Sequence, residues 1–127
     1  MKTLLALSVM LAACGTANAS TAHCHLIYGG ENSTVDATPT DQPYLVAGKR
    51  IGKYFEFKLV YVDRPATGAA IKIYTYSTVS GESVLLHQAT YLPPFDSRND
   101  AFGFTGMNSV YEPSKSSEFQ YWCEHKK

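Results

Sequence analysis

Residues that could carry chemistry gather near both ends of the chain. Residues 23–25 read His-Cys-His, and residues 123–125 read Cys-Glu-His. By residue type, two thiolates and two imidazoles drawn from these six positions would suit a tetrahedral zinc site. In an extended segment, however, Cys24 points away from the histidines on either side of it, because successive side chains alternate between the two faces. One local site therefore cannot use all three residues.

The two cysteines of these segments favour a disulfide. Cys24 and Cys123 are the only pair left once an export signal has been removed, and paired cysteines near the ends of a small exported domain typically form a cross-link. A closed loop of about 100 residues is worth about 4–5 kcal/mol in the chain-entropy model. We therefore predict a Cys24–Cys123 disulfide, no metal site and no cofactor. His23 and His25 share a strand face and are read as exposed strand histidines, with weak metal binding as the alternative.

The first residues predict export. A short positive start and an apolar run over residues 3–13 precede the small-x-small motif Ala17-Asn18-Ala19, so residues 1–19 are predicted to be a signal peptide. The alternative is a lipoprotein signal over residues 1–13. Leu11-Ala12-Ala13-Cys14 resembles a lipobox, and an acylated Cys14 would anchor the protein to the outer membrane. Both leave residues 20–127 as a single domain.

Charge and hydropathy limit the classes of partner that the sequence predicts. Eleven basic and eleven acidic residues give a formal net charge of zero, without a basic cluster that would indicate nucleic-acid binding. The apolar run of the leader is far shorter than the roughly 20 residues of a membrane-spanning helix. We expect an exported protein, periplasmic or secreted, with a lipid anchor at Cys14 as the alternative.

Alternating apolar and polar residues indicate strands that position these groups. The clearest is 53–62, in which Phe55, Phe57 and Leu59 share the face expected in the core. Together with 70–78 and 84–92 it is expected to form a three-stranded meander. Shorter strands are predicted at 22–29, 44–47 and 117–125, and short pairings within 93–116. The pattern predicts an all-β domain: a small antiparallel β-sandwich or barrel of about seven strands, closed by one disulfide.

Two segments are expected to be irregular. Residues 31–43 are rich in turn formers and read as a surface loop, and residues 93–116 are mostly loop. A Cys24–Cys123 link would make the first and last strands either neighbours in one sheet or partners across the core.

Tyrosine supplies the candidate binding surface. The chain holds nine tyrosines, and Tyr74 and Tyr76 share a strand face with Lys72. Tyr and Trp offer rigid contact area at low entropic cost; the alternative is that they form cross-strand pairs with a purely structural role. The candidate contact residues are Lys72, Tyr74, Tyr76, Arg98, Phe102, Tyr111 and Trp122, with Phe104 and Met107 as further loop residues.

These features favour a non-catalytic role, the binding of a protein, peptide or glycan in the cell envelope or outside the cell. The alternatives are a small hydrolase with its site near residues 93–116 and a structural envelope lipoprotein. No G-x-S-x-G motif is present. A hydrolase would need His87, which lies within a predicted strand, to meet Ser and Asp side chains in a cleft.

Overall fold

The computed structural model describes residues 20–97 and 101–127. The predicted signal peptide, Cys14 and Arg98 lie outside the described residues. Within them, no helix has the length and apolar character needed to cross a membrane.

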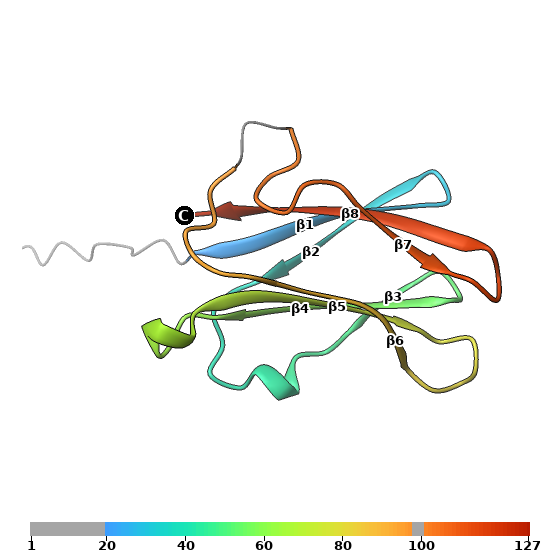
Figure 1. Cartoon of the computed structure of the whole chain (residues 1–127), viewed down its shortest axis with the longest axis horizontal. Coiled ribbons are helices and arrows are strands. Elements are labelled where there is room, and N and C mark those ends of the chain that lie inside the picture. The colour runs from blue at the N-terminus through green and yellow to red at the C-terminus, as the bar shows by residue number, and fades with distance from the viewer. Residues whose placement is uncertain (1–19, 98–100) are drawn as a thin grey trace, which may run out of the picture.

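Two four-stranded antiparallel sheets pack face to face as a β-sandwich (Figure 1). The first sheet, here the cysteine sheet, has the strand order β2 (Glu31–Ala37), β1 (Thr21–Tyr28), β8 (Ser117–Lys126), β7 (Asn108–Glu112). The second, the meander sheet, has the order β3 (Lys49–Ile51), β4 (Phe55–Val62), β5 (Ala70–Ser77), β6 (Val84–Tyr91). Two short 3-10 helices, η1 (Pro43–Leu45) and η2 (Ala66–Gly68), lie in the connections. The all-β sandwich fold is confirmed.

The core lies between the two sheets and is built from the faces that alternation predicted. Phe55 and Phe57 of β4 are fully buried, and Leu59 is 2% exposed. Across the sandwich they meet aromatic residues of β8: the ring centroids of Phe55 and Phe119 are 4.9 Å apart, and those of Phe57 and Tyr121 are 5.4 Å apart. Such edge-to-face pairs add to the stabilisation from apolar burial.

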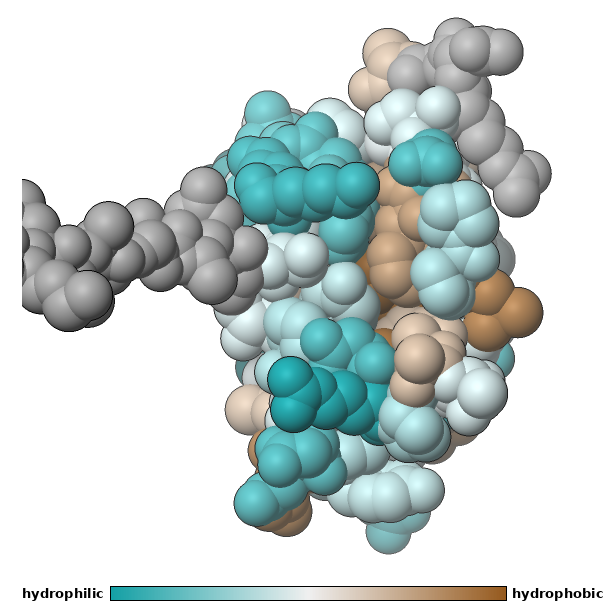
Figure 2. Space-filling view, turned by 90° about the vertical axis from the view of Figure 1, so that its left-hand side faces the viewer, coloured by the Kyte–Doolittle hydropathy of each residue, from teal (hydrophilic) through white to brown (hydrophobic). Residues whose placement is uncertain are grey.

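Hydrophilic residues surround this core at the end of the sandwich where β1 begins. Figure 2 shows apolar surface there as a narrow strip flanked by hydrophilic side chains.

The predicted disulfide is present. Cys24 and Cys123 are direct partners in the antiparallel pairing of β1 with β8, and both are fully buried. The first and last strands are therefore neighbours in one sheet, which was one of the two predicted arrangements. A structural disulfide indicates an oxidising location outside the cytoplasm.

Three local predictions were wrong or incomplete. Residues 31–37 form the edge strand β2 instead of a loop, because their backbone pairs with β1 although their side chains are mostly polar and exposed. Residues 44–47 are not a strand: Pro43 opens η1, where its missing N–H costs nothing. Within 93–116, residues 108–112 form a complete strand, β7. With β2, the short strand β3 and β7 added and 44–47 removed, the sandwich has eight strands.

Candidate functional site

The structure separates the predicted contact residues into two groups on opposite outer faces. Lys72, Tyr74 and Tyr76 project from β5 on the outer face of the meander sheet, since the alternate residues Ile71 and Ile73 are fully buried.

The other group lies on the cysteine sheet. Trp122 of β8 lies on its outer face, where its ring centroid is 5.9 Å from that of Phe102. Tyr111 of β7 is 53% exposed. The sequence had given no means of telling that Trp122 and Tyr74 belong to different sheets.

The first group lines a groove. Residues 38–48 cross the outer side of the meander sheet, and η1 lies below that sheet in Figure 1. Between η1 and strands β4 and β5 is a hollow of about 360 Å³. We call it the tyrosine groove; its lining residues are Pro43, Tyr44, Lys58, Val60, Val62, Gly68, Lys72, Tyr74 and Tyr76.

Two parallel tyrosine rings form one wall of the tyrosine groove. The ring planes of Tyr74 and Tyr76 are 11° apart and their centroids are separated by 6.4 Å. The ammonium of Lys58 lies 5.8 Å from the centroid of the Tyr76 ring, a cation–π distance. Burial, then the neighbouring Tyr74 and the carboxylate of Glu56, raise the pKa of Tyr76. Its hydroxyl therefore remains a hydrogen-bond donor at neutral pH.

The floor and rim of the groove are apolar, and the charged residues of its lining are lysines. Val60 is 3% exposed and lies beneath the groove. At η1, Tyr44 is 96% exposed and the adjacent Leu45 is 75% exposed. Among the described residues that line the groove, Lys58 and Lys72 are basic and none is acidic. The groove therefore combines apolar and aromatic surface with two positive charges.

Tyr44 and Lys58 were not among the contact residues predicted from the sequence. Residues 44–47 were read as a strand, so Tyr44 was not expected to face β5. Lys58 was correctly placed on the polar face of its strand. Its cross-strand position opposite Tyr74 is the signal that could have added it to the set, once β4 and β5 were aligned.

Part of the 93–116 loop packs into the fold, although its residues were predicted to be contact residues. The N–H of Phe104 donates to the carbonyl of Cys123 at 3.0 Å, and the N–H of Cys123 donates to the hydroxyl of Thr105 at 2.9 Å. Phe104 is only 8% exposed and belongs to the core. This part of the loop therefore completes the cysteine sheet beside Cys123 and does not offer Phe104 as a contact residue.

His87 is engaged with a tyrosine. Its Nε2 lies 2.6 Å from the hydroxyl of Tyr121, so a neutral His87 can accept that hydrogen bond. Burial lowers the pKa of His87 and raises the pKa of Tyr121, which keeps both groups uncharged. The serine and aspartate that the hydrolase hypothesis requires beside His87 are not its hydrogen-bond partners among the described residues.

Comparisons with protein-family models, with curated proteins and with solved structures found no match to this chain. Function is therefore inferred from the chemistry of the tyrosine groove and from the fold that carries it.

Proposed function

We propose that the protein binds an acidic peptide segment of a partner protein in the tyrosine groove. The observation that carries the proposal is the lining itself: parallel tyrosine rings, an apolar floor and two lysines, with no acidic side chain among the described lining residues. A groove that is mainly apolar with a few placed charges is typical of a specific binding site. The lysines would recognise a carboxylate, and the rings would contact the apolar side chains beside it.

The spacing of the rings, which is the two-residue repeat of β5 itself, suits an extended peptide that runs along this strand. Side chains on one face of an extended peptide repeat every two residues, about 6.6 Å. The centroids of Tyr74 and Tyr76 are 6.4 Å apart, so successive same-face side chains of the ligand would each meet one ring. The exposed Tyr44 and Leu45 would widen the contact beyond the peptide to the partner's surface.

The expected place of action is the periplasm or the cell exterior. The disulfide agrees with an oxidising compartment, and the predicted signal peptide would deliver the domain to the periplasm or the cell exterior. A partner in the same compartment is the expected ligand. No catalytic step is required of the protein.

Direct binding measurements test the proposal. Fluorescence anisotropy would compare labelled extended peptides that alternate acidic and aromatic residues with peptides in which lysine replaces each acidic residue. We expect saturable binding of the acidic set only. The double variant Lys58→Gln with Lys72→Gln should bind the peptide more weakly and with a smaller dependence on salt. Tyr74→Ala should lower the affinity at all salt concentrations.

A matched control is Tyr111→Ala, which removes an exposed tyrosine from the other sheet and should leave binding unchanged. Thermal unfolding of each variant shows whether the domain is intact. Equal binding of both peptide sets, or equal loss in the control, would contradict the proposal. Binding of acidic glycans instead of peptides would keep the groove but overturn the assigned ligand.

A further inference from the structure

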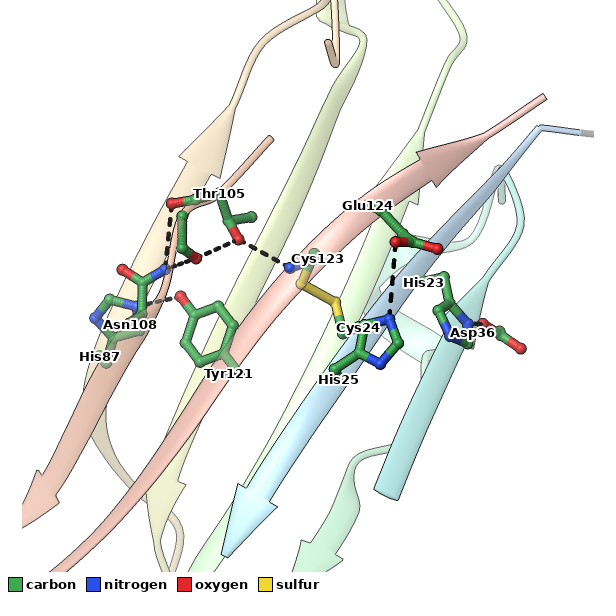
Figure 3. Close-up of a disulfide and its surroundings, with 11 residues drawn as sticks. His23, Cys24, His25, Asp36, His87, Thr105, Asn108, Tyr121, Cys123 and Glu124 are labelled. Carbon is green, nitrogen blue, oxygen red and sulfur yellow. Dashed lines mark hydrogen bonds and ion pairs between the residues drawn. A yellow bond between two sulfur atoms is a disulfide. The ribbon is translucent and has the colours of Figure 1, made fainter. Parts of the chain in front are cut away.

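A second cluster lies on the outer face of the cysteine sheet, opposite to the tyrosine groove. In the strand register, His23 of β1 pairs with Asp36 of β2 on one side and with Glu124 of β8 on the other. His25 follows two residues later on the same face of β1. Three strands therefore bring two imidazoles and two carboxylates together, as Figure 3 shows.

The donor atoms converge. One nitrogen from each of His23 and His25 and one carboxylate oxygen of Glu124 all lie within 4.8 Å of one another. The two imidazole rings are nearly perpendicular, with an interplanar angle of 85° and a centroid separation of 4.7 Å. All three residues are partly buried, so the cluster is partly shielded from water.

The nitrogen of His25 that faces Glu124 lacks a hydrogen bond. His25 Nε2 is buried and has no hydrogen-bond partner among the described residues. It lies 3.8 Å from Glu124 Oε2, too far for a hydrogen bond. Two ligands of a tetrahedral zinc ion, each about 2.1 Å from the metal, are about 3.4 Å apart. The observed separation, which is also that of an ion pair when His25 is protonated, is close to that of two ligands sharing one ion.

Neighbouring residues hold these ligands in place. The imidazole of His25 stacks on the indole of Trp122, with centroids 3.9 Å apart and planes within 12°. Nδ1 of His23 contacts a carboxylate oxygen of Asp36. Metal-binding histidines almost always give their second ring nitrogen to such a group, which orients the ring and raises its basicity. Lys126 contacts Oε1 of Glu124, at 3.2 Å, and not Oε2, so Oε2 is the oxygen available to a metal.

We propose that His23, His25 and Glu124 form a binding site for a divalent transition-metal ion of the zinc–copper type, with Asp36 orienting His23. Two imidazoles and a carboxylate are a ligand set that Zn²⁺ and Cu²⁺ accept. Three protein ligands leave one position for water or an exogenous ligand. A hollow of about 420 Å³, which Asn32, Thr34 and Trp122 also line, lies beside His25.

This proposal favours the alternative for His23 and His25, metal binding, over the expectation of exposed strand histidines. In the described structure the side chains of His23 and His25 are 16% and 32% exposed. Glu124 joins them only because the disulfide-linked strands β1 and β8 are neighbours, and Asp36 only because residues 31–37 form a strand. The site is independent of the tyrosine groove, which lies on the other sheet.

Isothermal titration calorimetry with ZnCl₂ and with CuCl₂, on disulfide-bonded protein carrying no polyhistidine tag, tests the proposal. We expect one ion per chain, with Cu²⁺ bound more tightly than Zn²⁺. Each of His23→Gln, His25→Gln and Glu124→Gln should lower the affinity more than tenfold. Asp36→Asn should lower it by about tenfold to a hundredfold, the range for such orienting groups.

The control is His125→Gln. His125 lies on the same strand as Glu124, but its Nε2 is 2.9 Å from the hydroxyl of Tyr61 and it faces away from the cluster. Its replacement should leave the affinity unchanged. Electron paramagnetic resonance of the Cu²⁺-loaded protein should show coupling to two imidazole nitrogens.

Three results would overturn the proposal: no saturable binding of one ion, affinity retained when His23 and His25 are both replaced, or an equal loss in the His125 control. Thermal unfolding without metal identifies a variant that fails to fold. In that case Glu124→Gln, which leaves the stacked His25 ring in place, decides between the outcomes.

Discussion

Replacing Thr75 by valine should stabilise the domain. Thr75 lies in the middle of β5, fully buried, opposite Phe57 on β4 and His87 on β6. Its hydroxyl is buried and has no hydrogen-bond partner among the described residues. An unpaired buried hydroxyl costs about 1–3 kcal/mol. Valine has nearly the same shape and places a methyl group there, so we expect Thr75→Val to raise the free energy of unfolding by about 1–2 kcal/mol.

Urea denaturation followed by circular dichroism at pH 7 measures this change. In thermal unfolding, each kcal/mol of added stability raises the melting temperature of a domain of this size by roughly 4–8 °C. Thr75→Ser is the matched control, because it keeps the hydroxyl and removes the methyl group. It should destabilise the domain by about 1 kcal/mol. A Thr75→Val variant less stable than the wild type would refute the reasoning, since it would mean that the hydroxyl makes a stabilising hydrogen bond.

Three further predictions concern stability. Replacing Cys24 and Cys123 together by alanine removes a cross-link between residues 99 positions apart and should cost about 4–5 kcal/mol in urea denaturation; a loss below about 2 kcal/mol would contradict this. Gly103→Ala would put a Cβ 2.0 Å from the carbonyl oxygen of Cys123. It should therefore lower the stability clearly more than Gly81→Ala. A Cβ at Gly81 would meet open space, and that variant should lose only the roughly 1–2 kcal/mol that a left-handed backbone costs. Equal losses of stability in the two variants would argue against the packing of the Gly103 loop on Cys123. Because burial lowers the pKa of His87 in the folded protein, its contribution to stability is complete above pH about 6.5 and is lost as the pH falls through the folded pKa. His87→Gln should flatten that part of the stability–pH profile, and an unchanged slope would count against the assignment.

Much of the fold could be predicted from alternation and cysteine placement. Strands β4 and β5 mostly alternate, because one face of each is buried against the other sheet. In β6 the alternation is clear only from Gln88 to Tyr91, and the pairing with β5 shifts register opposite Thr75 and Tyr76. The disulfide reduced the arrangement of the first and last strands to two possibilities. The edge strand β2 escaped prediction because its stability comes from backbone pairing with β1, which side-chain patterning does not record.

The functional surfaces depend on which strands are neighbours, and that could not be predicted. Alternation correctly placed Lys72, Tyr74 and Tyr76 on one strand face, but the groove also needs η1, which lies across that face. Trp122 was grouped with these tyrosines by residue type alone, although it lies on the opposite side of the sandwich. The histidine–carboxylate cluster needs the register of β1 with both β2 and β8.

The most direct test of the central claim, that the tyrosine groove binds an acidic peptide, is a nuclear magnetic resonance titration. Amide shifts of ¹⁵N-labelled protein would be followed as an alternating acidic–aromatic peptide is added. We expect saturable shifts confined to η1, β4 and β5, centred on Lys58, Lys72 and Tyr74. Shifts centred on β1 and β8 around Trp122, or no saturable shifts at all, would contradict it.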